Sequence, residues 1–419
     1  MPGSSTCDAA KIAANSVAPN NNTNFNSWRV TLSASCASLV GIGLARFAYT
    51  PLLPAIIGAH WFAPSAAAYL GAANLAGYLA GALLGRPLVA RVPAHIALRG
   101  LMLLAALAFF ACAVPVSLTW FFVWRLLSGI AGGALMVLAA PTVLPHVPHR
   151  RRGVASGAIF AGVGLGIAMS GTLVPLLLRQ GLTETWCGLG VLSLVLTLVA
   201  WSGWPTEAAV TPAAPQTQSP RRLPTVRLRA LYAEYALNAA ALVPHMLFLV
   251  DFVARGLKQG LDSGAQYWVL FGLGAVVGPV LSGHLADRIG FRSALRWAFI
   301  AQALGVVLPV LSTGAPSLIV SSFVVGAFTP GIVPLVLGRI HELVPHDVSA
   351  QKAAWSAATT AFALLQAAAA YGLTFVFAQS GGDYHLLFMI GTASVVLAVC
   401  VDFAVAAFAP RGKPHDAHK

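Results

Sequence analysis

This chain carries very little charge for its length. Of its 419 residues, 9% are Asp, Glu, Lys or Arg and 58% are hydrophobic. Soluble globular domains usually contain about 25% charged residues, so the composition excludes a water-soluble fold of this size. The net charge is nevertheless +13. Because the basic residues alternate with long apolar runs, they indicate loops at a membrane surface, and we expect no nucleic-acid partner.

Cysteine is also scarce and scattered. The cysteines form no Cys-x-x-Cys pair, and they are Cys7, Cys36, Cys112, Cys187 and Cys400. This pattern indicates neither a disulfide framework nor a metal site, and we expect no cofactor. No segment resembles the glycine-rich loop of nucleotide-binding proteins, so ATP-driven transport by this chain alone is not expected.

Long apolar runs are abundant instead. A helix needs about 20 apolar residues to cross roughly 30 Å of hydrocarbon. Twelve segments meet this requirement, and we number them spans 1 to 12 in chain order. They lie near residues 30–58, 65–85, 95–114, 118–143, 153–178, 185–204, 229–254, 264–285, 293–313, 316–338, 350–377 and 385–408. The predicted fold class is an all-α membrane protein with twelve transmembrane helices.

A proline-rich segment divides these spans into two groups of six. It reads PTEAAVTPAAPQTQSPRRLPTV and is typical of a flexible linker. The polar N-terminal segment lacks the layout of a signal peptide, and we expect it to be a disordered cytoplasmic tail. The predicted parts are a tail (1–27), an N-terminal six-helix bundle (28–204), a cytoplasmic linker (205–227), a C-terminal six-helix bundle (228–409) and a second cytoplasmic tail (410–419).

A faint internal repeat supports two pseudo-symmetric bundles. A shift of 197 residues places GALLGRPLVAR over GPVLSGHLADR, so that Gly81 matches Gly278 and Arg91 matches Arg288. Ala90 stands where the second copy has Asp287, so the first copy is degenerate. Such duplicated halves are common in secondary transporters.

Basic residues mark alternate loops and give the orientation. The basic loops contain Arg86, Arg91, His146 to Arg152, Arg221, Arg222, Arg227, Arg229, Arg288, Arg292, Arg339, Lys352, Arg411, Lys413 and Lys419. The other loops contain little beyond Arg179, Arg255 and Lys258. By the positive-inside rule, both termini face the cytoplasm of a bacterial cell, with the chain in its cytoplasmic (inner) membrane.

The loop after span 8 carries the most specific motif. The sequence GHLADRIGFR resembles the signature loop of the major facilitator superfamily of secondary transporters. The resemblance implies the twelve-helix major facilitator fold and a conformational latch formed by Gly283, Asp287, Arg288, Gly290 and Arg292. We expect Gly283 to allow close helix approach and Gly290 to allow a turn that other residues resist. The alternative is a tight basic turn in any polytopic membrane protein.

Span 1 places an arginine near mid-membrane. Its motif GIGLARFAYTPLLP resembles a poorly characterised bacterial branch of the superfamily. A central arginine costs about 2.5–3.5 kcal/mol on insertion scales, so Arg46 should face a cavity or a partner. We assign Arg46 and Tyr49 to the substrate cavity. The alternative for Arg46 is a bond to helix carbonyls or to a neighbouring carboxylate. Pro51 and Pro54 should bend the outer end of the helix.

Spans 4 and 5 contain further motifs. Arg125, Gly129 and Gly133 share one face of span 4 and resemble the superfamily's fourth-helix motif, which implies a role for Arg125 in proton coupling or packing. The alternative is an arginine that snorkels to the outer surface. Span 5 has small residues at steps of four and three, which predict a close-packing face. Those residues are Gly157, Ala161, Gly164, Ala168 and Gly171.

Span 7 is the most polar span. Glu234 and Asp251 are the candidate proton carriers, and Asn238 and His245 are candidate cavity residues. Pro244 should loosen the helix beside His245. The alternatives are an i,i+4 ion pair between Asp251 and Arg255, a surface position for Glu234 and a core histidine.

The resemblance implies that spans 1, 4, 7 and 10 line a central cavity. In span 10, Pro330 and Pro334 predict a hinge. Weaker cavity candidates are Tyr49, Asn74, Trp355 and Gln366, for which the alternative is an amphipathic residue at a helix end or in packing.

The predicted function is secondary active transport. A monomer would move a small organic solute, anionic or polar, across the membrane by alternating access, coupled to protons. The alternative is proton-driven efflux of a drug or metabolite. Antiporters of the superfamily have a glycine-rich fifth helix that ends in a Gly-Pro pair, and span 5 resembles this imperfectly because Gly171 and Pro175 are separated. A membrane-embedded enzyme or a non-transporting sensor is less favoured, because no loop is large enough for a catalytic or signalling domain.

Overall fold

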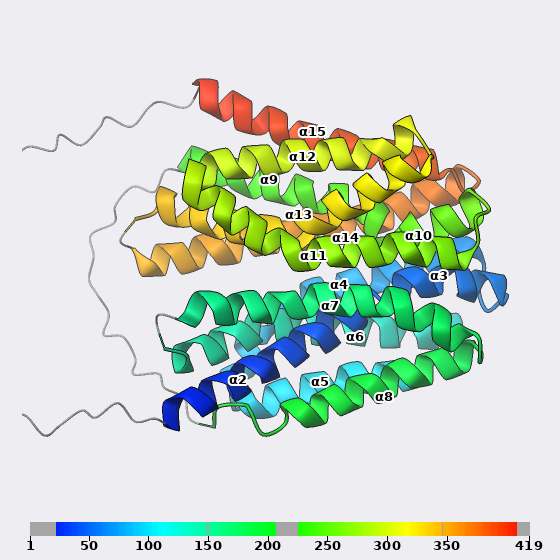
Figure 1. The fold of residues 1–419 in the computed structure, drawn as a ribbon, viewed down its shortest axis with the longest axis horizontal. Coiled ribbons are helices and arrows are strands. Elements are labelled where there is room, and N and C mark those ends of the chain that lie inside the picture. The colour runs from blue at the N-terminus through cyan, green and yellow to red at the C-terminus, as the bar shows by residue number, and fades with distance from the viewer. Residues whose placement is uncertain (1–21, 149–150, 207–224, 346, 409–419) are drawn as a thin grey trace, which may run out of the picture.

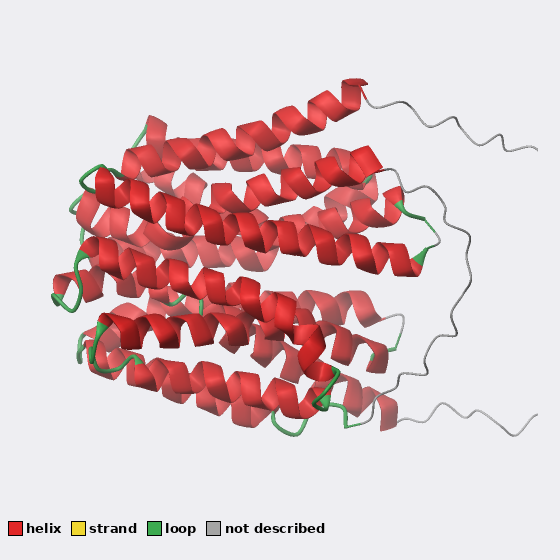
Figure 2. Ribbon diagram, turned by 180° about the vertical axis from the view of Figure 1, so that it is seen from behind, coloured by secondary structure: helices red, strands yellow, loops and turns green. Residues whose placement is uncertain are grey.

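The computed structural model describes residues 22–148, 151–206, 225–345 and 347–408, and all its regular elements in these ranges are helices (Figures 1 and 2). The prediction of twelve spans is confirmed, since twelve helices are long and apolar enough to cross a membrane. The start of α2 and the end of α15 lie at the same end of the molecule (Figure 1). Most of the predicted linker and both predicted tails lie outside the described residues.

The N-terminal half contains spans 1 to 6. Span 1 is interrupted, and its three helices are followed by one main helix for each later span. These elements are α2 (Asn22–Ser38), η1 (Leu39–Leu44), α3 (Tyr49–Gly58), α4 (Pro64–Val89), α5 (Ala94–Ala111), α6 (Leu118–Val143) with the short η2 (Leu144–His146), α7 (Arg152–Leu178) and α8 (Leu182–Ala200).

The C-terminal half contains spans 7 to 12, and its first span is also interrupted. Its elements are α9 (Thr225–Val243), η4 (Pro244–Phe248), α10 (Leu249–Asp251), η5 (Phe252–Gly256), α11 (Leu261–Ile289), α12 (Phe291–Leu311), α13 (Ala315–Leu343), α14 (Val348–Gln379) and α15 (Tyr384–Phe408). Two predicted boundaries shift, because α2 begins inside the predicted tail and α9 inside the predicted linker. Apolar runs mark where hydrocarbon begins, whereas helical hydrogen bonding continues beyond it.

Spans 1 and 7 are the central helices. Their most apolar windows are 89% and 94% buried, whereas those of spans 6 and 12 are 33% and 28% buried. Apolar side chains such as Leu198 and Leu304 remain exposed on the outer helices. In a bilayer such side chains face lipid, so the two most buried spans are the ones that can border an internal site.

The two halves repeat one packing arrangement. The Cβ position of Gly81 in α4 meets the Ile130 carbonyl of α6, and that of Gly278 in α11 meets the Ala327 carbonyl of α13. One offset of 197 residues relates both members of each pair, from 81 to 278 and from 130 to 327. The sequence repeat therefore reports equivalent helix contacts in the two halves, α4 with α6 and α11 with α13.

The small-residue face of span 5 forms part of the contact between the halves. Gly164 of α7 packs against the backbone at Ala275 and Val276 of α11, and Gly272 of α11 packs against Ala168. The predicted close-packing face is confirmed at these positions. Gly157 differs, because no described atom outside its own stretch of helix lies within 4 Å of its Cβ position. The second contact between the halves joins α4 and α14.

The signature loop is a one-residue turn between α11 and α12. Gly290 has φ +79°, a conformation that side chains resist, and this part of the prediction is confirmed. The expected close approach at Gly283 is wrong, because no described atom outside its own stretch of α11 lies within 4 Å of its Cβ position. Gly278, more than one turn earlier, makes the close contact instead. Asp287 and Arg288 are exposed, and neither forms an ion pair with any other described residue.

Candidate functional site

Span 1 breaks at residues 45–48, between η1 and α3. The Ala45 and Phe47 amides donate to carbonyls five residues back, at Val40 and Ile42. Pro51 cannot donate to the Phe47 carbonyl, which accepts from the Thr50 amide at 3.2 Å instead. The break therefore lies before the prolines, and it changes the direction in which the side chains of residues 45 to 48 point.

Arg46 lies within this break and contacts the other half of the molecule. Its Nη2 donates to Gln366 Oε1 at 2.6 Å and lies 3.8 Å from Met246 Sδ. Its guanidinium carbon lies 4.7 Å from the ring centroid of Tyr78 and 5.2 Å from that of Phe47. We call these five residues the central site. They come from spans 1, 2, 7 and 11, so the site joins the two halves.

The guanidinium cation of the central site has no anionic partner among the residues that the structure describes. Arg46 Nε is buried and has no hydrogen-bond partner among the described residues. None of the ion pairs between described residues involves Arg46. The aromatic rings stabilise the guanidinium partly, because cation–π contacts contribute about 0.5–2 kcal/mol. A carboxylate entering this site could therefore form a charge-assisted bond that the protein itself does not supply.

Arg125 fixes the broken part of span 1. It is buried, its Nη1 donates to the Ala45 carbonyl at 2.8 Å, and its guanidinium carbon lies 4.5 Å from the Tyr49 ring. Asn74 Nδ2 donates to the Arg125 carbonyl at 3.2 Å. Arg125 therefore does not snorkel, and no described carboxylate pairs with it. Tyr49 packs against Arg125 through its ring, and its hydroxyl donates to the Ala67 carbonyl at 2.6 Å.

Asp251 is held by its own neighbours. Arg255 Nε donates to Asp251 Oδ1 at 2.5 Å and Arg255 Nη2 to Oδ2 at 2.9 Å. The Tyr384 hydroxyl donates to Oδ2 at 2.5 Å. The structure therefore shows the i,i+4 ion pair, and both oxygens of this buried carboxylate are occupied.

His245 lies inside the C-terminal bundle, in the irregular turn that begins at Pro244. Its Nε2 lies 2.8 Å from Ser321 Oγ, which itself donates to the Gly305 carbonyl at 2.7 Å. Nε2 is therefore the donor in this pair. The Phe388 ring packs edge-on at 5.0 Å. The side chain is buried away from the central site, so its predicted place in the cavity is not seen here.

Asn238 also points into the C-terminal bundle. Its Nδ2 donates to Gln302 Oε1 of α12 at 2.5 Å. Both side chains are buried, and Asn238 Oδ1 and Gln302 Nε2 have no partner among the described residues. Asn238 therefore does not contact the central site.

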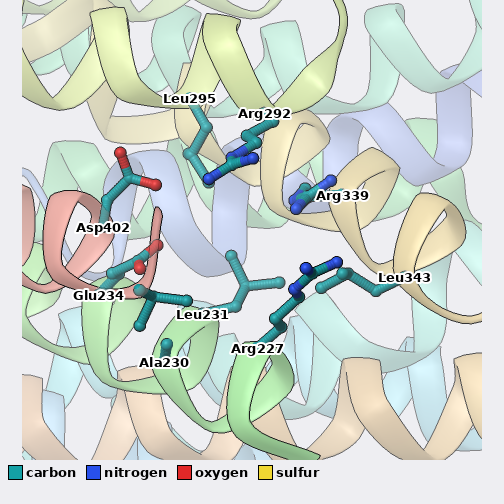
Figure 3. A pocket seen from close by; sticks show the side chains of 10 residues that line it. Arg227, Ala230, Leu231, Glu234, Arg292, Leu295, Arg339, Leu343 and Asp402 are labelled. Atoms are coloured by element: carbon teal, nitrogen blue, oxygen red, sulfur yellow. The ribbon is translucent and has the colours of Figure 1, made fainter. Parts of the chain in front are cut away.

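Glu234 lines a pocket at the end of the molecule that carries the basic loops. The pocket is about 410 Å³, including open solvent, and lies between α9, α12, α13 and α15. Figure 3 shows Glu234 and Asp402 on one side of it and Arg292 and Arg339 on the other. Asp402 is paired with Arg296. Glu234 is only 6% exposed, yet it faces this pocket, so it can exchange a proton with water there.

Contacts across the halves favour one end. At the end opposite the basic loops, α3 packs against η4, α10 and α11, and the Thr50 hydroxyl donates to the Met246 carbonyl. The other ends of these spans, α2 and α9, pack mainly within their own halves. Spans 1 and 7 therefore close the central site from the end opposite the basic loops.

The structure brings together only some of the predicted site residues. Arg46 and Gln366 meet between the halves. Tyr49 bonds within the N-terminal half, and Asn238 and His245 bond within the C-terminal half. Glu234 and Arg292 line the same pocket. The sequence analysis missed several partners, which are Tyr78, Met246, Gln302, Ser321 and Tyr384. Gln302 alone gave a usable signal, as an amide within the apolar run of span 9.

Comparison with known proteins agrees with this architecture. The family described as "Uncharacterised MFS-type transporter YbfB" matches residues 38–403. A gallate transporter of Pseudomonas putida is 29% identical over 298 residues, which cover 62% of this chain and 65% of that protein. A 3-(3-hydroxy-phenyl)propionate transporter of Escherichia coli (strain K12) is 29% identical over 282 residues, covering 63% and 66%. The chain thus spans just under two thirds of the length of these relatives.

Two solved structures are similar over nearly all of the chain. A D-xylose-proton symporter has a TM-score of 0.70 at 16% identity, covering 90% of this chain and 97% of that one. The xylose transporter XylE from E. coli, in a partially occluded inward open conformation, has a TM-score of 0.67 at 15% identity, covering 93% and 99%. At these identities the likeness concerns the fold.

Proposed function

Because the chain belongs to the MFS-type transporter family of YbfB, we propose that it moves a small organic anion across the cytoplasmic membrane by alternating access. The observation that carries this proposal is the central site, where Arg46 joins the two halves and no described carboxylate pairs with it. In transporters of this architecture the solute binds near the bilayer midplane, between the repeats. A solute carboxylate would replace Gln366 as the partner of Arg46.

The first substrate class to test is an aromatic carboxylate. The two relatives named above are transporters of gallate and of 3-(3-hydroxy-phenyl)propionate, both of which carry a carboxylate on or near an aromatic ring. The central site offers matching chemistry, with a guanidinium for the carboxylate and the Tyr78 and Phe47 rings close beside it. Ring pairs of this kind are worth about 0.5–1.5 kcal/mol beyond the buried area.

Glu234 is the proposed proton carrier. It is buried but faces a pocket, and no described residue forms an ion pair with it. Asp251 is tied to Arg255 and Tyr384, and Arg125 is tied to the Ala45 carbonyl. We therefore assign Asp251 and Arg125 positioning roles, and Glu234 the proton.

The cycle follows from the orientation. With the basic loops and both termini in the cytoplasm, the contacts of α3 with η4 and α10 close the outer side. Opening to the outside must break the hydrogen bonds that Arg46 forms with Gln366 and Thr50 with Met246. Neither half provides the whole central site, whereas one chain does, so a monomer suffices.

The test is counterflow of radiolabelled gallate in proteoliposomes. Wild-type protein should exchange external labelled gallate for internal unlabelled gallate. Unlabelled gallate should compete, whereas pyrogallol, the same ring without the carboxyl group, should not. Competition by pyrogallol as strong as that by gallate would reject the carboxylate as the recognised group. Absence of counterflow with a panel of aromatic and aliphatic carboxylates would reject the proposed function.

A further inference from the structure

An unusual pair of buried amides lies one helical turn from Glu234. Asn238 of α9 and Gln302 of α12 form one hydrogen bond of 2.5 Å, and each has one further polar atom without a partner among the described residues. Reversing both amides would exchange the donor and the acceptor but would still leave one of each. An unpaired buried polar atom costs about 1–3 kcal/mol, so two side by side call for a ligand.

A water molecule has the right chemistry for this ligand. It can accept from the free amide N–H and donate to the free amide oxygen at the same time. Buried waters typically form about three hydrogen bonds, so a third remains. Glu234 precedes Asn238 by four residues on the same helix, a rise of about 6 Å. Its carboxyl group is therefore a candidate for the third bond, one turn of α9 away.

Apolar side chains close this region on the far side. Leu242 follows Asn238 by one turn of α9, and Val306 follows Gln302 by one turn of α12. With Val325 of α13 they belong to one fully buried hydrophobic cluster. Water that reaches the amides from the pocket therefore meets a dry layer before His245.

We propose that Asn238 and Gln302 bind a water molecule that extends the Glu234 pocket into the C-terminal bundle. This water is the inner end of a proton path that starts at the pocket and is separate from the solute site. This inference rests on the proposed proton coupling through Glu234. When the O–H bond of Glu234 breaks, the proton passes to a pocket water and the carboxylate remains. The bound water donates one hydrogen to that carboxylate and stays bonded to both amides.

Other charges line the pocket beside Glu234, from α9, α12, α13 and α15. Arg292 and Arg339 line the pocket from α12 and α13, Arg227 lines it from α9, and Asp402 of α15 is paired with Arg296. These groups lie on the pocket side of Glu234. The water bound to the two amides solvates the opposite, inner side of Glu234, where the arginines do not reach and the other neighbours are apolar.

The test compares two kinds of variant in proteoliposomes with gallate. The double variant Asn238→Leu and Gln302→Leu removes all four amide atoms and fills the space with carbon. It should retain counterflow within about twofold and lose at least about fivefold of the accumulation driven by an imposed proton gradient. The control Ser193→Ala removes a buried hydroxyl without a described partner in the N-terminal half and should change neither.

The variant Gln302→Ser separates the water site from a purely structural amide bond. Serine is too short to replace Gln302 directly, but it leaves a hydroxyl and room for water, so accumulation should remain. Loss of accumulation in Gln302→Ser with counterflow intact would overturn the proposal, as would normal accumulation in the double leucine variant. If the leucine variant does not fold, the serine result decides. Absence of gallate counterflow in the wild-type protein would instead contradict the proposed function.

Discussion

The ion pair between Asp251 and Arg255 should respond unequally to removal of its two partners. The Asp251 side chain is 1% exposed and that of Arg255 is 31% exposed. Arg255→Met would leave a buried carboxylate with only the Tyr384 hydroxyl. Removing one partner of a buried pair costs about 3–5 kcal/mol, and the partial exposure of Arg255 places this case at the lower end, about 3 kcal/mol. Asp251→Asn would leave a guanidinium that solvent reaches, at a cost of about 1 kcal/mol.

Unfolding by denaturant in detergent micelles would measure both costs. The double variant closes a thermodynamic cycle and should give a coupling energy of about 1–3 kcal/mol. The expected order is a larger loss for Arg255→Met than for Asp251→Asn. Equal losses, or the reverse order, would refute the argument that burial of the carboxylate sets the cost.

Two further predictions use paired variants. Glu234→Gln should retain gallate counterflow and lose proton-driven accumulation, whereas Asp251→Asn should retain both, because Arg255 and Tyr384 already hold the Asp251 carboxylate. Proteoliposome assays at fixed pH would measure both activities. Loss of accumulation in Asp251→Asn alone would reverse the assignment of the proton carrier. Gly278→Ala should destabilise the protein by about 1–3 kcal/mol, because the new methyl group meets the Ala327 carbonyl. Gly283→Ala, which adds a methyl group in open space inside α11, should instead raise the unfolding free energy by about 0.4–1 kcal/mol, because alanine is the better helix former, as measured by denaturant unfolding.

Local features of this fold were predictable because they depend on short stretches of sequence. The twelve apolar runs predicted twelve spans, and Gly290 predicted the positive φ of the loop after α11. The repeat was also readable, since Gly81 and Gly278 make equivalent contacts. The expectation for Gly283 failed because the motif shows which residue is small, and it does not show which helix faces it.

The site was less predictable, because sequence position gives the depth of a residue in a span but not the side that it faces. Spans 1 and 7 contain irregular turns at η1, η4 and η5, which rotate the later residues relative to a regular helix. His245, in η4, faces the interior of the C-terminal half and meets Ser321 there, and Asn238, in the regular helix α9 before these turns, meets Gln302 in the same half. Those partners come from other spans, and one sequence does not reveal such pairings.

Equilibrium binding of gallate to purified Arg46→Gln protein tests the central claim most directly. Hydrogen bonds to a charged group contribute about 1.5–3 kcal/mol, so the Kd for gallate should rise roughly 10- to 150-fold. Arg99→Gln, which changes an arginine bonded to the Trp201 carbonyl far from the central site, serves as the control and should leave the Kd unchanged. An unchanged Kd in Arg46→Gln, with wild-type protein binding gallate, would contradict the placement of the solute at Arg46.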